Sequence, residues 1–212
     1  MGYVLYGDKG TGAFCVEAAL AEAGAEYEFK VISLEKNEQR EPAYLAINPS
    51  GKLPALKLPS GEIATESSGL MLVVADRHPE ANLLPPPGTD ARAQALRWIT
   101  FMASEIYPMV EISDYPERFV PAGKEAEALK KKVQERIRER LLVIERSAAG
   151  PWILKSGFSL VDIYAVMFTR WRNTVGKEWL ASGHVDRINA IAMALKARPR
   201  IAPIWPRHFW ND

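Results

Sequence analysis

Cysteine and histidine are scarce in this sequence of 212 residues, which holds one cysteine and three histidines. A single cysteine, Cys15, cannot form a disulfide within the chain, and this fits a reducing compartment. The histidines, His78, His184 and His208, are widely scattered and share no ligand spacing with Cys15. A cluster of His and Cys ligands is therefore not supported, and we expect no metal.

An excess of charge and long hydrophobic runs are also missing, since 27 lysines and arginines balance 26 aspartates and glutamates. Without a net field, we expect neither nucleic acid nor an anionic membrane as a partner. The uncharged stretch from Ile63 to Val74, broken by Glu66, is shorter than the ~20 apolar residues of a membrane span. Asp8 and Lys9 interrupt the first apolar segment too early for a secretory signal. These absences predict a cytoplasmic protein.

A proline-rich stretch at residues 79–88 separates two halves with different secondary-structure patterns and is interpreted as a linker. Before it, short β-like runs alternate with helical runs in the order β-α-β, an irregular segment, then β-β-α. The expected strands and helices of this half are Tyr3–Tyr6, Ala13–Ala23, Tyr27–Ile32, Leu53–Leu58, Ile63–Ala64 and Ser67–Arg77.

The half after the linker shows only helical periodicity. Apolar residues recur every three or four positions from Ala126 to Ile144, which predicts a long amphipathic helix. The lysine run 130–132 on this helix is accompanied by glutamates, so we interpret it as a solvated face. Another helical pattern spans 91–111, with a bend expected at Pro108. We predict an α/β domain over residues 1–80 and an all-helical domain over 89–212.

The segment NPSGKLPAL, residues 48–56, places Pro54 just inside a predicted strand, where it would forfeit a ladder hydrogen bond. A cis Leu53–Pro54 bond would turn the N–H and C=O of Leu53 outward, where they can pair with an extended peptide. An ordinary trans proline at a strand edge is the alternative.

The segment ATESSGL puts Glu66 and Ser67 at the expected start of a helix. Unpaired N–H groups and the positive end of the helix dipole favour a carboxylate there. Glu66 suits a positively charged amine, so one turn can hold both charges of an α-amino-acid head group. The alternative is a plain helix cap with an acidic residue beside it.

The loop from Gly7 to Gly12 holds three glycines, which allow close approach to a ligand. It matches neither the dinucleotide fingerprint nor the phosphate loop of nucleotide-binding proteins. Instead it places Thr11 and the first amides of the following helix beside the groove over Leu53.

Three segments in this order, VLYGDKGTGAFCVEAALAEAG, NPSGKLPAL and ATESSGLMLVVADRHP, resemble the first domain of bacterial-type cytosolic glutathione S-transferases. A fourth, GFSLVDIYA, is similar to the capping-box segment that begins a core helix in the family's second domain. Its Ser159 and Asp162 stand three residues apart, as a capping box requires. The resemblance implies a thioredoxin-like N-terminal domain, an all-α C-terminal domain and a homodimeric glutathione transferase that acts in detoxification.

By this resemblance, the co-substrate is glutathione, whose cysteinyl backbone pairs with Leu53 beside a cis Pro54. Its γ-glutamyl carboxylate meets Ser67, and its amine meets Glu66. Lys52 is the first candidate to neutralise the glycyl carboxylate, and Lys36 and Arg40 are its competitors.

Activation of the thiol needs a further group, because a free thiol with a pKa near ~8.5 is only slightly ionised at neutral pH. The resemblance implies a hydroxyl near the end of the first strand or the start of the first helix. Thr11, assisted by the amides of Gly12 and Ala13, is the first candidate, and Tyr6 is the second. Cys15 lies two residues beyond the expected position and is interpreted as a packing residue.

The function expected from these residues is attack by the glutathione thiol on a small hydrophobic electrophile or a disulfide. One alternative is a glutathione-dependent disulfide reductase, which a threonine in the loop favours. The other is a binding module that keeps the glutathione site without activating the thiol.

Overall fold

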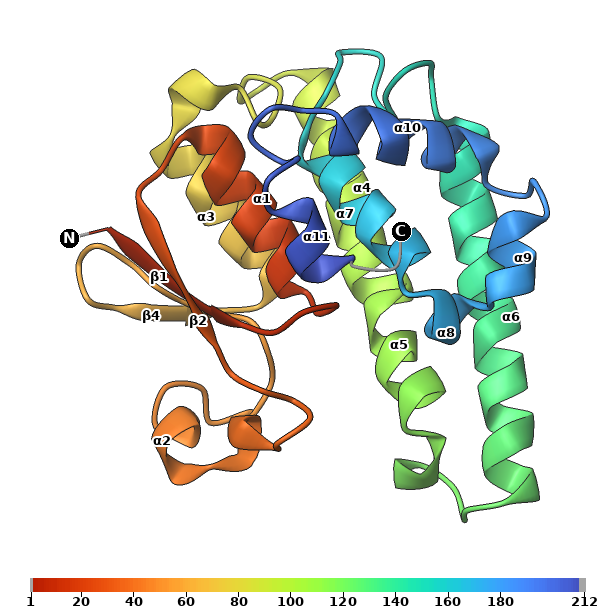
Figure 1. Ribbon diagram of the computed structural model, residues 1–212. Coiled ribbons are helices and arrows are strands. Elements are labelled where there is room, and N and C mark those ends of the chain that lie inside the picture. The colour runs from red at the N-terminus through yellow and green to blue at the C-terminus, as the bar shows by residue number, and fades with distance from the viewer. Residues whose placement is uncertain (1, 210–212) are drawn as a thin grey trace. The chain divides into compact units, whose positions relative to one another are not determined.

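The computed structural model describes residues 2–209, and its contacts divide the chain into two compact units (Figure 1). The first unit comprises Met1–Leu84 together with Leu195–Asp212, and the second comprises Pro85–Ala194. The expected domains were 1–80 and 89–212, so the structure differs in grouping the chain after Leu195 with the first unit. Positions 1 and 210–212 of those domains lie outside the described residues.

The first unit is built on a four-stranded sheet of order β2-β1-β3-β4, in which β1 pairs with β2 in parallel and the other pairs are antiparallel. The predicted helices Ala13–Ala23 and Ser67–Arg77 are confirmed, and each strand differs from its predicted range at one end or both. The third strand begins after Pro54, so this proline precedes the strand and was wrongly placed inside it. The elements are β1 (Tyr3–Gly7), α1 (Ala13–Ala23), β2 (Tyr27–Val31), η1 (Glu38–Arg40), α2 (Pro42–Leu45), β3 (Ala55–Lys57), β4 (Ile63–Thr65), α3 (Ser67–Arg77) and η2 (Pro79–Ala81).

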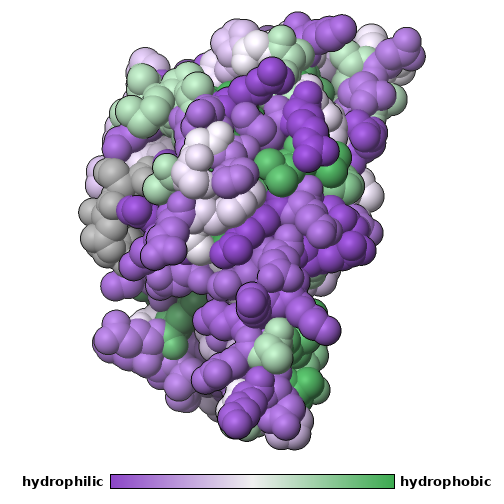
Figure 2. All heavy atoms as spheres, turned by 90° about the vertical axis from the view of Figure 1, so that its right-hand side faces the viewer, coloured by the Kyte–Doolittle hydropathy of each residue, from purple (hydrophilic) through white to green (hydrophobic). Residues whose placement is uncertain are grey.

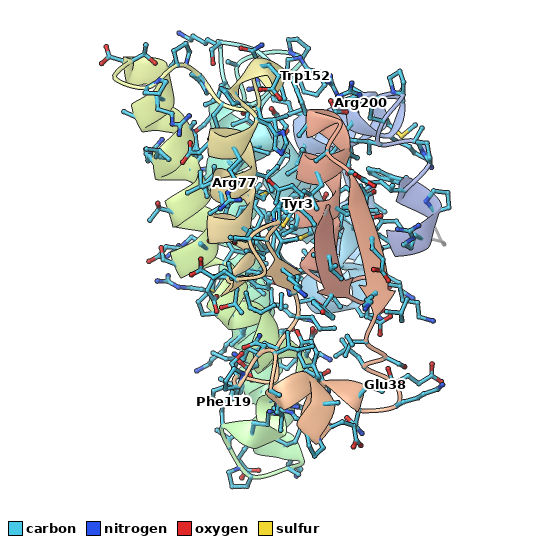
Figure 3. The ribbon with its side chains drawn as sticks, turned by 90° about the vertical axis from the view of Figure 1, so that its left-hand side faces the viewer. Tyr3, Glu38, Arg77, Phe119, Trp152 and Arg200 are labelled. Atoms are coloured by element: carbon cyan, nitrogen blue, oxygen red, sulfur yellow. The ribbon has the colours of Figure 1, made fainter. Side chains whose placement is uncertain are left out.

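Alternating burial along β1 gives the sheet two different faces. Tyr3 and Leu5 are buried, whereas Val4 and Tyr6 are only half-buried, as expected when successive side chains point to opposite faces. The helices α1 and α3 pack together on one face (Figure 1). Tyr3 is labelled on the sheet in Figure 3, and its hydroxyl oxygen is 3.1 Å from Nε2 of His78, the residue after α3. The sheet is therefore covered on the side that carries Tyr3 and Leu5.

The short helix α11 (Trp205–His208) returns to pack on α1 within the first unit. The ring of Phe14 lies 5.7 Å from that of Trp205 and 4.6 Å from that of Phe209, both edge-on. Apolar contact of this kind explains why residues after Leu195 belong to the first unit rather than to the helical one.

A buried carboxylate strengthens this attachment. Glu17 of α1 is fully buried, and its Oε2 lies 2.6 Å from Nε2 of His208. Its Oε1 accepts hydrogen bonds from Arg207 and, at 3.0 Å, from the hydroxyl of Tyr27. Because a buried charge is costly unless it is paired, these partners are what allow a glutamate at this position.

The second unit is entirely helical. The predicted helix 91–111 is in fact two helices that meet at Ile106, because Pro108 can occupy the first turn of a helix but not its interior. The long amphipathic helix is confirmed. None of the helices within residues 2–209 is both long and apolar enough to cross a membrane. The helices are α4 (Asp90–Glu105), α5 (Tyr107–Asp114), η3 (Pro116–Arg118), α6 (Lys124–Ser147), α7 (Leu160–Arg170), α8 (Arg172–Val175), α9 (Lys177–Ala181) and α10 (Asp186–Lys196), whose last turn enters the first unit.

The core helix α7 begins with the predicted capping box. Oγ of Ser159 accepts from the N–H of Val161, while the Asp162 carboxylate accepts from the N–H of Ser159 and of Ile153, both at 2.8 Å. Burial raises the pKa of Asp162 to about 6, and these backbone hydrogen bonds oppose the rise. The carboxylate thus ties the loop before α7 to its first turn.

We expect Asp162→Ala to lower the free energy of unfolding by about 2–4 kcal/mol, because two buried N–H groups lose their acceptor. Urea unfolding at pH 7 measures this. Asp90→Ala, the same change at an exposed first-turn position of α4, is the control and should cost less than about 1 kcal/mol. Equal losses for the two variants would show that the capping box is not the cause.

We expect Glu17→Gln to destabilise the protein by about 3 kcal/mol, because the fully buried position loses the carboxylate that accepts from buried His208 and from the more exposed Arg207. The matched control is Glu28→Gln on the sheet, where an exposed pair with Lys30 at 3.9 Å is worth less than about 1 kcal/mol. Thermal unfolding of both variants compares the two positions. A loss at Glu17 no larger than the loss at Glu28 would contradict the role given to this carboxylate.

Candidate functional site

Strand register brings the three predicted segments to one end of the sheet. Tyr6 pairs with Ala55, and Ala55 pairs in turn with Thr65. The end of β1, the chain entering β3 from Pro54 and the chain leaving β4 for Glu66 therefore lie side by side. Neighbouring strands are about 4.8 Å apart, so these three segments span about 10 Å, the length of an extended tripeptide.

Thr11 is nearly buried in the loop after β1. Its hydroxyl donates to the carbonyl oxygen of Asp8 at 2.8 Å and accepts from the N–H of Ala13 at 3.2 Å. Thr11 therefore supports the first turn of α1, and its proton is engaged with the backbone. Donation of that proton to a ligand thiol requires rotation of the side chain away from Asp8.

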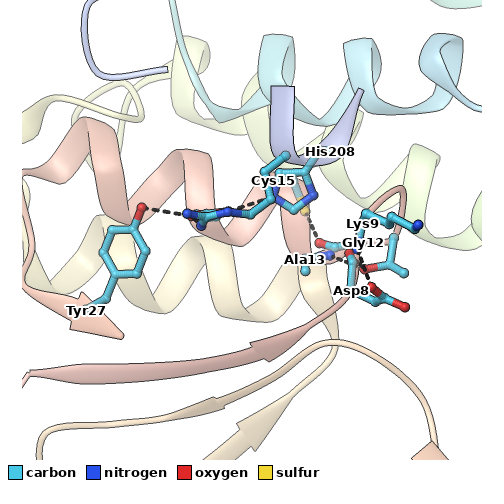
Figure 4. Close-up of polar contacts among 10 residues, drawn as sticks. Asp8, Lys9, Gly12, Ala13, Cys15, Tyr27 and His208 are labelled. Atoms are coloured by element: carbon cyan, nitrogen blue, oxygen red, sulfur yellow. Dashed lines mark hydrogen bonds and ion pairs between the residues drawn. The ribbon is translucent and has the colours of Figure 1, made fainter. Parts of the chain in front are cut away.

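Asp8 was not identified from the sequence, although it holds this loop in place. Its Oδ1 accepts from the N–H of Lys9 at 2.8 Å (Figure 4). Its Oδ2 accepts from the N–H of Leu34, also at 2.8 Å. The carboxylate is nearly buried and joins the β1–α1 loop to the segment after β2. Its partner at position 34 is distant in sequence, so only the strong turn preference of aspartate next to glycine was visible beforehand.

Tyr6 lies on the sheet face opposite to Leu5, because the side chains of a strand alternate. Its ring centroid is 6.4 Å from that of Tyr44 in α2 and 6.0 Å from Nζ of Lys30. The structure therefore does not place Tyr6 on the face covered by α1, and Thr11 lies in the loop just before α1. Which of the two hydroxyls activates a thiol stays a prediction.

The chain before β3 is fixed through the carbonyl oxygen of Lys52. That oxygen accepts from the hydroxyl of Tyr44 at 2.8 Å and from Nδ2 of Asn48 at 2.7 Å. The Leu53–Pro54 bond is cis. Within residues 2–209, the backbone N–H and C=O of Leu53 make no hydrogen bond. Leu53 thus presents a free backbone N–H and C=O next to a carbonyl group that two side chains hold in place.

Glu66 precedes α3 in an unusual backbone conformation, with φ 68° and ψ 102°. Residues other than glycine rarely adopt positive φ, and this backbone conformation costs about 1–3 kcal/mol. The side chain of Glu66 is exposed, while Ser67, the first residue of α3, is almost fully buried. The strained backbone therefore sets an exposed carboxylate beside the free amides of a helix start.

Cys15 is fully buried and its thiol donates to the carbonyl oxygen of Gly12 at 3.1 Å. Burial raises the pKa of Cys15 to about 12, although a hydrogen bond from the Ser67 side chain lowers it in part. The thiol is thus un-ionised at neutral pH, in agreement with its interpretation as a packing residue.

The three candidate cations for a ligand carboxylate, Lys52, Lys36 and Arg40, are all exposed. The guanidinium of Arg40 lies against the backbone of Gly51, where a Cβ would be 2.8 Å from Nη1. Arg40 is therefore next to the segment that carries Lys52 and Leu53. As for metals, the described residues include no group of three or more His, Cys, Asp and Glu side chains that could hold an ion.

Comparison with known proteins places these features in a family. Residues 13–77 match the model of the glutathione S-transferase N-terminal domain. The chain is also 32% identical over 207 residues to the GST-like protein YncG of Escherichia coli strain K12, covering 96% of this chain and 97% of that one. The chain belongs to the glutathione S-transferase family.

Two further members of the family cover almost the whole chain. Glutathione S-transferase GstA of Escherichia coli O157:H7 is 27% identical over 202 residues, 93% of this chain and 94% of its own. A glutathione transferase homolog from Sulfitobacter, solved with bound glutathione, is 28% identical with a TM-score of 0.86, covering 96% of each chain. The thioredoxin-like first domain and the helical second domain are thereby confirmed.

The positive φ at Glu66 predicts that glycine is more stabilising than alanine at this position, the reverse of the usual order. Glu66→Gly should be more stable than Glu66→Ala by about 1 kcal/mol, because glycine accepts positive φ without a Cβ clash. Chemical denaturation of both variants measures the difference. At Glu62, an exposed turn residue that is not among those with positive φ, the alanine variant should be at least as stable as the glycine variant. An alanine variant at 66 that matches or exceeds the glycine variant would rule out strain there.

Proposed function

We propose that this glutathione S-transferase family member binds glutathione in its first unit and presents the thiolate to an electrophile or a disulfide. The observation that carries the proposal is the register Tyr6–Ala55–Thr65, which gathers three segments with complementary chemistry within the length of a tripeptide. Bound glutathione in the Sulfitobacter homolog supports it.

Each part of the tripeptide has a partner in this arrangement. The cysteinyl backbone pairs with the free N–H and C=O of Leu53, as an added β-strand does. The γ-glutamyl amine meets the Glu66 carboxylate, and the γ-glutamyl carboxylate meets the amide and hydroxyl at Ser67. Lys52, Lys36 or Arg40 neutralises the glycyl carboxylate.

Stabilisation of the thiolate falls to the start of α1. The helix dipole and the amides of Gly12 and Ala13 favour a negative charge there. The Thr11 hydroxyl adds a donor once it rotates from the carbonyl of Asp8 toward the sulfur. Tyr6 is the second candidate for this role, although it lies on the other face of the sheet.

The engagement of Thr11 with Asp8 favours a second function, a binding module that holds glutathione without activating it. In that case the thiol of bound glutathione keeps its solution pKa. A glutathione-dependent disulfide reductase lies between the two, because thiol–disulfide exchange needs only partial ionisation of the thiol. We also propose a homodimer, as the family resemblance implies.

Ultraviolet titration of the thiolate of bound glutathione tests the proposal. We expect its pKa to lie about 1–2 units below the free value of ~8.5 in the unaltered protein. Thr11→Ala should move it back toward the free value, whereas Thr11→Ser, which keeps the hydroxyl, and Tyr6→Phe should leave it in place.

The remaining outcomes are equally informative. A bound thiol with its solution pKa that Thr11→Ala does not change indicates the binding module. Rates on a chlorinated aromatic and on a glutathione-capped disulfide distinguish a transferase from a reductase. Failure of the unaltered protein to bind immobilised glutathione would overturn the proposal as a whole.

A further inference from the structure

A cleft of about 630 Å³ lies in the second unit, where α6 faces α8 and α9. Four cationic side chains line it, Lys130, Arg138, Arg172 and Lys177, against a single carboxylate, Glu178. Figure 2, which looks onto the side of the molecule where α6, α8 and α9 lie, shows a predominantly hydrophilic surface. The cleft therefore concentrates positive charge in a chain whose overall charge is almost balanced.

The four cations of the cleft form no ion pair within residues 2–209. Among the described residues, none of them lies within ion-pair distance of a carboxylate, although other arginines of the same helix do. Arg136 lies 3.4 Å from Glu139, and Arg140 lies 3.0 Å from Glu105. Like charges that outnumber the carboxylates around them repel one another, and a bound anion relieves that repulsion.

The acidic residue that interacts electrostatically with Lys130 is already engaged elsewhere. Asp114 accepts a hydrogen bond from the hydroxyl of Thr174 at 2.7 Å, and burial raises its pKa. Even with Asp114 counted beside Glu178, four cations face two carboxylates. The cleft therefore keeps an excess of positive charge for a ligand.

One wall of the cleft is held in a fixed geometry. Nε of Arg138 donates to the carbonyl oxygen of Val175 at 2.8 Å, which uses one of the five N–H groups of the guanidinium. The guanidinium also lies 5.8 Å from the ring of Trp179, which stacks on His184 at 5.3 Å. Gly176, with φ 107°, leaves room for Arg138, since a Cβ there would collide with Nη2. Arg138 is thus pre-positioned rather than a free surface arginine.

We propose that this cleft binds a small polyanion with at least two oxyanion groups, a phosphate ester or a polycarboxylate. Its volume falls within the ~300–1,000 Å³ typical of small-ligand sites. Planar guanidinium groups such as those of Arg138 and Arg172 bind phosphate and carboxylate through paired hydrogen bonds. All lining residues belong to the second unit, so the proposal does not depend on glutathione binding in the first.

The position of Lys130 departs from the sequence-based interpretation of the lysine run as a solvated face. Lys131 and Lys132 are exposed, as that interpretation expects, whereas Lys130 is half-buried and lines the cleft. Successive residues on a helix point about 100° apart, which explains how one lysine of the run differs from its neighbours. Lys130 can therefore be substituted to test the cleft, and Lys131 and Lys132 can be substituted as the control.

Isothermal titration of the full chain at low ionic strength, with inorganic pyrophosphate and with citrate as probes, tests the site. We expect saturable binding of one molecule per chain, weakened about tenfold or more in a Lys130→Gln, Lys177→Gln double variant. The Lys131→Gln, Lys132→Gln double variant carries the same change of net charge and should keep the affinity of the unaltered protein. Arg172→Gln, at an exposed position that folding tolerates, should also weaken binding.

Two results would overturn the proposal. One is the absence of saturable binding of both probes to the unaltered protein, and the other is an equal loss of affinity in the control double variant. Binding of pyrophosphate alone assigns the site to phosphate esters, and binding of citrate alone assigns it to polycarboxylates. Affinity for glutathione, measured on the same samples, should not change in the cleft variants.

Discussion

The pairing of Ala55 with Tyr6 on one side and Thr65 on the other is the constraint on which the candidate site depends. A shift of this register by one residue would turn every side chain of the short strand β3 to the opposite face. It would also separate Leu53 from Glu66. Backbone hydrogen bonds in the middle of the sheet therefore position the site. Its polar side chains lie at the end of the paired strands.

Local signals in the sequence were sufficient for much of the fold. Helix α1 ends where predicted because Gly24 adopts the left-handed conformation that caps a helix, with φ 67°. The capping box of α7 was visible because Ser159 and Asp162 interact with neighbours in the chain. Pro108 also predicted the interruption of the helical segment 91–111. The two helices meet at Ile106, two residues before this proline.

Features that depend on distant residues were not predictable in this way. Glu17 resembles any helical glutamate until Arg207 and His208, 190 and 191 residues later, surround it. Asp8 likewise acquires its role only through the backbone at Leu34. The cationic cleft needs α8 and α9 to fold back onto α6, and neither short helix has a strong periodic signal. Thr11 was placed correctly in its loop, but its hydrogen bond to the backbone could not be inferred from residue type.

The attachment of α11 to α1 has a consequence for how the chain is made. During synthesis, Phe14 and Glu17 leave the ribosome long before Trp205, Arg207 and His208 exist, and domains otherwise tend to fold as they emerge. Until then the outer side of α1 carries an uncovered aromatic ring and an unmatched carboxylate. The first unit is thus completed only after the whole helical unit has been translated.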